Sequence, residues 1–217
     1  MIRLIQGCDR LQHAFEMDRM HTIRAEVFHR RLQWDVRVED GWEIDEFDDH
    51  NPLYLLSIAP DTGDVRGSVR LLPTTGPNML RDVFSALLPE DMMIADPLIW
   101  ESSRFSIDPD HACNARVCGQ VNEITAELLL GMAEIGKLVG LRQIVSVYDV
   151  TMARLFRKAN CRAETIGAPV RFGRVLTYAG LFETNDTMIR NLRKMSGISG
   201  SVLERAAPTD PLAALVA

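Results

Sequence analysis

The chain has 217 residues, of which 47% are hydrophobic and 25% are charged, and this is close to the average for soluble globular proteins. The composition excludes a disordered, fibrous or small disulfide-stapled protein, and the length predicts one large domain. The formal net charge of −6 argues against general nucleic-acid binding, because that activity requires a basic surface to neutralise phosphates.

The sequence shows no pattern for membrane insertion or secretion. Its longest apolar stretch, 128–141, is interrupted by Glu134 and Lys137 and falls short of the roughly 20 apolar residues that cross a bilayer. At the N-terminus, charge at Arg3 and Asp9 leaves no room for the apolar core of a signal peptide. We therefore expect a cytoplasmic protein without a membrane span.

The cysteines and histidines do not form a metal-binding pattern. Cys8, Cys113, Cys118 and Cys161 lack the paired short spacing of a zinc site, and the five histidines supply no matching ligand pair. Thiols stay reduced in the cytoplasm. We expect no disulfide, no metal and no cofactor.

Charge is distributed unevenly along the chain. Residues 35–64 contain ten acidic side chains against one basic, which suits the binding of a cation. Residues 137–174 contain eight basic side chains against two acidic, which suits an anion. Without further observations, a solvated face is the simpler interpretation of either segment.

Helices and strands alternate in the N-terminal half. The absence of glycine and proline over 8–32 predicts one or two helices there. The turn residues at 60–64 separate two apolar runs, 53–59 and 65–72, and predict a β-hairpin. A short helix is predicted around residues 79–88, and a strand over residues 99–107.

The most regular helix pattern lies in the C-terminal half. Apolar positions from Val121 to Val139 step by three or four residues, which predicts a long amphipathic helix. The remaining elements are a strand over 143–148, a helix over 151–158 capped by Thr151, and one or two strands within 170–182. We predict an α/β domain with a single mixed sheet flanked by helices over 1–196, and a flexible tail over 197–217.

Four stretches combine arginines, aromatic residues and acids. They are Arg-Ala-Glu-Val-Phe-His-Arg-Arg-Leu-Gln-Trp at 24–34, Glu-Ile-Asp-Glu-Phe-Asp-Asp at 43–49, Gly-Ser-Val-Arg-Leu-Leu at 67–72 and Trp-Glu-Ser-Ser-Arg-Phe at 100–105. In this order they resemble the acyl-homoserine-lactone synthases, the autoinducer synthases of bacterial quorum sensing. The similarity extends to about Leu192, and it implies a fold related to the GCN5-related N-acetyltransferases.

The resemblance implies a reaction between S-adenosylmethionine and an acyl thioester. The amine is acylated, and the methionine carboxylate then attacks its own γ-carbon, which closes a lactone and expels 5′-methylthioadenosine. S-adenosylmethionine is a substrate in this scheme. Because an α-amino group has a pKa of about 8 and is mostly protonated at neutral pH, the acylation requires a base.

Three residues of the fourth stretch are the predicted catalytic residues. Glu101 is the candidate base, and the alternative is a carboxylate that pairs with a neighbouring arginine for structure. Ser103 shares a strand face with Glu101 and is expected to orient substrate. A regular strand points Arg104 the other way, so either a bulge turns it toward the site or it pairs with Asp45 or Asp48.

S-adenosylmethionine carries a sulfonium cation, an amine and an adenine, so carboxylates and aromatic faces are expected to bind it. The predicted binding residues are Arg24, Phe28, Trp34, Asp45, Asp48 and Arg70. Ordinary packing stays the alternative for the two aromatic residues. The two arginines are expected either to clamp the substrate carboxylate or to hold the two aspartates in place.

The acyl donor is expected on a phosphopantetheine arm. Arg116 and Gly119 match only part of the pyrophosphate-binding loop of related acetyltransferases. Arg154, Arg157 and Lys158 share one face of the predicted helix and are predicted to dock an acidic acyl-carrier protein. The phosphates of coenzyme A suit the same charges.

The acyl chain is expected to lie between the sheet and the long helix. The predicted pocket residues are Phe84, Phe105, Leu128, Met132 and Ser146. Ser146 occupies the position where relatives that favour 3-oxo chains carry threonine, and it keeps the hydroxyl. Two other hypotheses remain: an N-acyltransferase of the same fold that acts on another amine, and a non-enzymatic sensor of S-adenosylmethionine or an acyl carrier.

Overall fold

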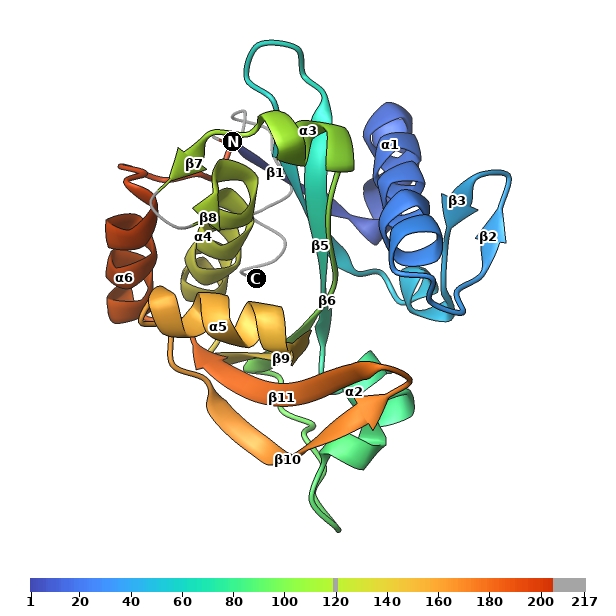
Figure 1. Cartoon of the computed structure of the whole chain (residues 1–217), viewed down its shortest axis with the longest axis vertical. Coiled ribbons are helices and arrows are strands. Elements are labelled where there is room, and N and C mark those ends of the chain that lie inside the picture. The colour runs from blue at the N-terminus through green and yellow to red at the C-terminus, as the bar shows by residue number, and fades with distance from the viewer. Residues whose placement is uncertain (119–120, 205–217) are drawn as a thin grey trace.

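The computed structural model describes residues 1–118 and 121–204 (Figure 1). Its centre is a seven-stranded sheet in the order β1-β4-β5-β6-β9-β11-β10. The strands are β1 (Ile2–Gln6), β4 (Leu53–Ile58), β5 (Val65–Pro73), β6 (Ile99–Ile107), β9 (Gln143–Asp149), β10 (Glu164–Phe172) and β11 (Val175–Glu183). The β6–β9 pair is parallel and the other pairs are antiparallel, so the predicted mixed sheet is confirmed.

Helices cover both faces of the sheet. They are α1 (Ala14–Arg24), α2 (Met79–Asp82), α3 (Pro109–Asn114), α4 (Glu123–Leu138), α5 (Val150–Lys158) and α6 (Asp186–Ser196). Figure 1 shows α4 and α6 on one side of β5 and β6, with α1 on the other. In the described residues, no helix is both long and apolar enough to cross a membrane.

Shorter elements connect this frame. The helical turns are η1 (Gly7–His13), the π-helical η2 (Ala25–Arg31), η3 (Glu46–Asp49) and η4 (Ser85–Leu87), and the small strands are β2 (Val38–Glu39), β3 (Trp42–Glu43), β7 (Val117–Cys118) and β8 (Val121–Asn122). The predicted N-terminal helix is thus a succession of η1, α1 and η2. The short helix predicted around 79–88 is divided between α2 and η4.

Strand alternation assigns neighbouring residues to different cores, because successive side chains point to opposite faces of a sheet. Leu55 and Ile144 belong to the core beneath α4 and α6. Tyr54 and Leu56 belong to the core beneath α1. We call these two sides the α4 face and the α1 face.

Helix α4 is buried on almost every side, although its sequence predicts a polar face. Two of its glutamates are buried with partners. Glu127 accepts hydrogen bonds from Ser57 Oγ at 2.7 Å and Arg66 at 2.6 Å, and Glu134 accepts one from Arg193 at 2.8 Å. These partners offset the cost of removing the carboxylates from water.

Two helices differ from the sequence prediction. The side chain of Asp149 accepts a hydrogen bond from the Met152 amide at 2.8 Å, so Asp149 rather than Thr151 caps α5. Helix α6 was not predicted. Asn185 caps its start, and Gly197 ends it with a φ of +71°, as is usual for helix-terminating glycines.

Part of the predicted tail belongs to the folded domain. The Ile2 amide donates to the Val202 carbonyl and the Glu204 amide donates to the Ile2 carbonyl, both at 2.7 Å. Val202 is buried. The predicted boundary at 197 therefore lies too early, because these residues extend the sheet edge at β1; residues 205–217 lie outside the described residues.

Candidate active site

Three arginines and three carboxylates meet on the α1 face of the sheet. They are Arg24 at the end of α1, Glu43 on β3, Asp45 and Asp48 around η3, Arg70 on β5 and Arg104 on β6. We call these six residues the charge cluster. The side chains of Arg24, Glu43 and Arg70 are at most 1% exposed, so the cluster lies in the interior, with its formal charges balanced.

Arg24 and Arg70 hold the cluster carboxylates. Arg24 donates to both Asp48 oxygens at 2.9 Å and to Glu43 at 2.5 Å. Arg70 donates to Asp48 at 2.9 Å and also to Asp45. Of the two roles predicted for these arginines, the geometry fits the holding of the aspartates.

The local sequence around η3 explains why both aspartates face the arginines. Asp45 caps η3 by accepting from the Phe47 amide at 3.0 Å, and Asp48 accepts from the Asp45 amide at 3.0 Å. This reciprocal capping fixes the turn. Burial alone raises the pKa of Asp48, but the charges of Arg24 and Arg70 outweigh it and hold that pKa well below its usual range.

Arg104 joins the cluster because β6 bulges. The β5–β6 register shifts between Ser68 and Arg70, and Arg104 has a φ of +53°. Its guanidinium reaches Glu43 at 2.9 Å and Asp45 at 2.8 Å. The two predicted alternatives are therefore both correct, since a bulge turns Arg104 and the turned side chain pairs with Asp45.

Aromatic rings border the cluster. Phe28 lies on the π-helical turn η2, a geometry frequent at functional sites, and its ring lies 5.3 Å from the Arg104 guanidinium. Phe28 and Trp34 are stacked at 5.3 Å. Phe28 is buried, whereas Trp34 is 39% exposed, so Trp34 forms the outer edge of this aromatic pair.

Glu101 is buried beside the charge cluster on the α1 face. Its oxygens accept hydrogen bonds from the Met79 amide at 2.9 Å and the Leu80 amide at 2.5 Å, at the first turn of α2. Burial raises the pKa of Glu101 to about 7. In the described residues no arginine forms an ion pair with it, so the alternative of an arginine-paired carboxylate is wrong. Ser103 accepts from Arg70 Nε at 3.1 Å.

An apolar pocket lies on the α4 face. Met132 and Ser146, two of the predicted acyl-pocket residues, line it. Leu128 and Phe105 belong to the same core but not to the pocket wall. Phe84 lies on the other face, where it packs edge-on against the Phe172 ring at 4.9 Å, because the segment after β5 crosses to the α1 face.

The two regions adjoin at one place in the sheet. Ser102 and Ser146 form the last residue pair of the parallel β6–β9 ladder, and their hydroxyls are hydrogen-bonded. Beyond this pair, β6 continues against β5 and β9 continues against β11. The strands therefore separate beside Glu101 on one face and the apolar pocket on the other.

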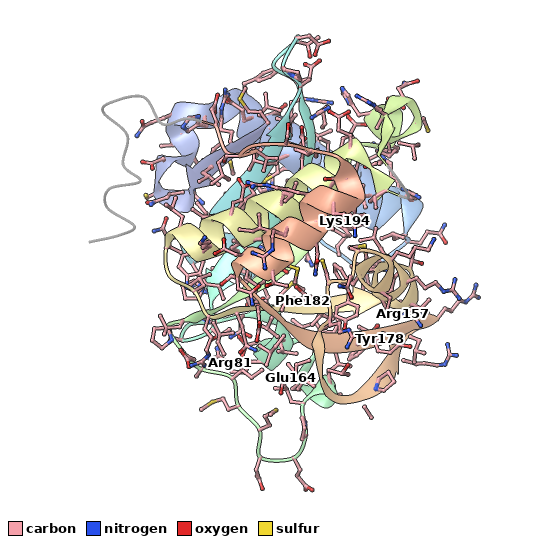
Figure 2. The ribbon with its side chains drawn as sticks, turned by 90° about the vertical axis from the view of Figure 1, so that its left-hand side faces the viewer. Arg81, Arg157, Glu164, Tyr178, Phe182 and Lys194 are labelled. Carbon is pink, nitrogen blue, oxygen red and sulfur yellow. The ribbon has the colours of Figure 1, made fainter. Side chains whose placement is uncertain are left out.

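The predicted basic surface is present on α5. Arg154, Arg157 and Lys158 are all exposed on this helix, and Figure 2 labels Arg157. Arg116, from the partial phosphate-loop match, is also exposed. Gly119, the other residue of that match, lies outside the described residues.

Comparison with known proteins decides the family. Residues 9–192 match the model of the autoinducer synthases. The chain belongs to this family. It is 35% identical over 193 residues to an acyl-homoserine-lactone synthase of Rhizobium etli, covering 88% of this chain and 86% of the relative. It is 37% identical over 164 residues to one of Agrobacterium fabrum, covering 76% and 77%.

Solved structures show the same fold. The CoA-dependent acyl-homoserine lactone synthase BjaI, solved with SAM and isopentyl-CoA, superposes with a TM-score of 0.84 at 24% identity and covers 100% of this autoinducer synthase and 98% of BjaI. A putative N-acetyltransferase from Lactobacillus plantarum superposes with a TM-score of 0.52 at 12% identity, over 85% and 99% of the two chains. These likenesses confirm the predicted relation to the N-acetyltransferase fold.

Sequence reasoning missed two residues of this synthase's site. Glu43 joins Arg24 to Arg104, and its place two residues before Asp45 within the matched acidic stretch was an available signal. Tyr54 donates its hydroxyl to Asp48 at 2.8 Å. It lies within an apolar strand, where nothing in the local sequence distinguishes it from a core residue.

Proposed function

We propose that this synthase makes an N-acyl-L-homoserine lactone from S-adenosylmethionine and an acyl thioester. The neutral amine nitrogen attacks the thioester carbonyl, an amide bond forms and the thiol leaves. The methionine carboxylate then attacks the γ-carbon, the carbon–sulfur bond breaks, and the sulfonium leaves as neutral 5′-methylthioadenosine. Both steps balance without an oxidant or reductant.

The main support for this proposal is that two different environments lie on opposite faces of the sheet at the same point. The charge cluster and Glu101 lie on the α1 face, and the apolar pocket lies on the α4 face. The Ser102–Ser146 contact lies between them, where β6 and β9 part. A reaction that joins a charged amino-acid derivative to an acyl chain requires both environments at one reacting centre.

The position and pKa of Glu101 support its role as the base. A pKa of about 7 leaves part of the carboxylate deprotonated at neutral pH, as general base catalysis requires. We assign Glu101 to the removal of a proton from the attacking amine, directly or through a water. Ser103 and Arg104 are assigned to the orientation of substrate beside it.

Exposure divides the cluster carboxylates between structural and binding roles. The side chains of Glu43 and Asp48 are 0% and 3% exposed, whereas that of Asp45 is 16% exposed. We therefore assign Asp45 to the cationic part of S-adenosylmethionine, with Trp34 as the aromatic face that a ligand reaches first. Arg24 and Arg70 hold Asp45 and Asp48 in place for this contact.

An acyl-carrier protein is the donor that the charge distribution favours. Arg154, Arg157 and Lys158 are exposed, and an acidic carrier is attracted to such a surface. Coenzyme A phosphates suit the same side chains, so both donors belong in the test.

The test is mass spectrometry of the purified protein incubated with S-adenosylmethionine and a panel of acyl-carrier-protein and acyl-CoA thioesters. We expect 5′-methylthioadenosine and an acyl-homoserine lactone to appear together. Thiol release without methylthioadenosine identifies an N-acyltransferase that uses another amine. Binding of both substrates without turnover identifies a sensor, and either result contradicts the proposal.

A further inference from the structure

The apolar pocket on the α4 face extends from Ser146 to the start of α6, and the proposed reaction does not explain what limits it there. The pocket is narrow, with a cavity volume of about 40 Å³. Met132, Phe156, Phe182 and Leu192 contribute to its wall, from α4, α5, β11 and α6. An acyl chain in this pocket is limited in length by the side chains at the end farthest from the reacting centre.

Strand register gives the direction of the pocket. Ser146 lies beside the point where β6 and β9 separate, opposite Gly180, and Ile144 lies opposite Phe182. Ile144 and Phe182 line the pocket, as do residues at the start of α6. A chain that enters beside Ser146 therefore extends along β9 toward Ile144 and the start of α6, on the face of the sheet opposite to Glu101.

A second, polar hollow adjoins the apolar pocket near the start of α6. Its lining includes Asn160, Arg162 and Asn191, and it shares Cys161, Glu183 and Met188 with the apolar pocket. These three shared residues form the partition between the two spaces.

Met188 is the member of this partition suited to closing an apolar space. Glu183 is exposed, whereas Cys161 is buried and its thiol donates to the Ala159 carbonyl at 3.5 Å. Met188 is half-buried and packs against the core of the α4 face. Its unbranched thioether fills irregular apolar gaps, and it lies in the first turn of α6, where the pocket ends.

Polar contacts hold helix α6 against α4 and the end of α5. Lys137 of α4 pairs with Asp186, and Arg193 donates to Glu134 at 2.8 Å. Asn191 donates to the Asn160 carbonyl at 2.9 Å. A chain that exceeds the pocket length must therefore displace the Met188 side chain rather than the helix.

We propose that Met188 closes the far end of the acyl pocket and sets the longest straight acyl chain that the synthase accepts. The inference rests on the proposed function for the identity of the occupant. Shortening Met188 to alanine joins the apolar pocket to the polar hollow and gives a longer chain an exit. A phenylalanine at this position fills the end and favours a shorter chain.

The experiment compares Met188→Ala and Met188→Phe with Met195→Ala as the matched control. Met195 lies on the same helix and packs against the same core, but it does not line the pocket. Acyl-CoA thioesters that lengthen by two carbons at a time are titrated calorimetrically without S-adenosylmethionine, and turnover of the same series gives kcat/KM. We expect Met188→Ala to shift the ratio of long-chain to short-chain affinity by about tenfold, because each buried methylene contributes about fourfold.

Met188→Phe should shift the ratio in the opposite direction, and Met195→Ala should leave it within about twofold. Unchanged ratios in both Met188 variants, or an equal shift in the control, overturn the inference. The calorimetric ratio distinguishes this inference from the proposed function. A wild-type protein that forms no lactone contradicts the proposed function, while its binding profile still reports whether Met188 limits chain length.

Discussion

The guanidinium of Arg104 lies 2.8 Å from the carboxylate of Asp45, and the backbone of Arg104 is left-handed, with a φ of +53°. The two facts are linked, because a regular strand would point this side chain to the α4 face. The bulge costs local conformational energy, and the ion pairs with Asp45 and Glu43 compensate for it. Arg104 is therefore a strained residue at the point where it contacts Glu43 and Asp45.

The strain at Arg104 predicts an unusual order of stability among its variants. Arg104→Gly and Arg104→Ala both lose the ion pairs, so both should lose most turnover. Glycine adopts a positive φ without the penalty of a β-carbon, so Arg104→Gly should be more stable than Arg104→Ala by about 0.5–1 kcal/mol. Urea unfolding of the two variants measures this difference, and an alanine variant that matches or exceeds the glycine variant would show that the bulge does not persist.

The raised pKa of Glu101 predicts the pH dependence of the acylation. Because burial raises this pKa to about 7, kcat/KM should increase as the pH rises through that value. Glu101→Gln should lower turnover by about 10²–10⁴-fold and remove this limb of the profile, leaving the titration of the substrate amine at about 8. The exposed Glu90→Gln is the control, and a Glu101→Gln variant with full activity rules out Glu101 as the base.

The same pKa makes a prediction for stability. The folded state binds the Glu101 proton more tightly than the unfolded state, in which the pKa of this carboxyl is near its ordinary value of 4.5. The stability associated with this proton is present below that value and is lost as the pH rises through about 7. The unfolding free energy of Glu101→Gln should therefore vary less than that of the wild type across this window, and urea titrations at several pH values measure the difference. Equal slopes would mean that Glu101 titrates normally.

Local sequence patterns predicted most strands and the long helix because those elements depend on nearest neighbours and turn residues. Arg24 comes from a different sequence motif than Asp45 and Asp48, and the three lie together in the structure, as predicted. The reason is that charged residues in the interior require partners. The sequence did not decide to which face of the sheet the side chain of Arg104 points, because a bulge depends on the register of β5 against β6. Likewise, only the path of the chain after β5 places Phe84 on the α1 face, and the sequence does not encode that path locally.

The contacts of Asp48 predict how the charge cluster responds to loss of one charge. Asp48 accepts hydrogen bonds from Arg24, Arg70 and Tyr54. Asp48→Asn leaves two buried guanidinium groups undercompensated and should lower the unfolding free energy by about 3–5 kcal/mol. Tyr54→Phe removes one hydrogen bond and should cost about 1 kcal/mol. Chemical denaturation measures both losses of stability. A loss for Asp48→Asn that is as small as the loss for Tyr54→Phe would mean that the charge cluster is solvated rather than buried.

The lowered pKa of Asp48 also predicts how the stability of the fold depends on pH. Its ionised form is stabilised in the folded state by Arg24 and Arg70, against the effect of burial. The corresponding stability is present above the unfolded pKa, near 3.8, and is lost as the pH falls further. The wild type should therefore lose stability below about pH 4, and Asp48→Asn should lack that part of the acid dependence. Acid titration monitored by circular dichroism compares the two proteins.

The exposed bases of α5 predict a donor-specific kinetic effect. The double variant Arg157→Glu, Lys158→Glu reverses two charges on the proposed docking surface. It should raise the apparent KM for an acyl-carrier-protein thioester by about tenfold at low salt, because a carrier protein presents an extended acidic surface to this helix. The KM for the acyl-CoA thioester should rise less.

The control is Arg190→Glu with Lys194→Glu, which makes the same change in net charge on α6; Figure 2 labels Arg157 and Lys194 on the two helices. Docking through α5 requires the α5 variant to exceed this control with the carrier-bound donor. The excess should shrink as added salt screens the charges. Equal KM increases for both donors, or for both double variants, would mean that the carrier protein does not dock on this face of α5.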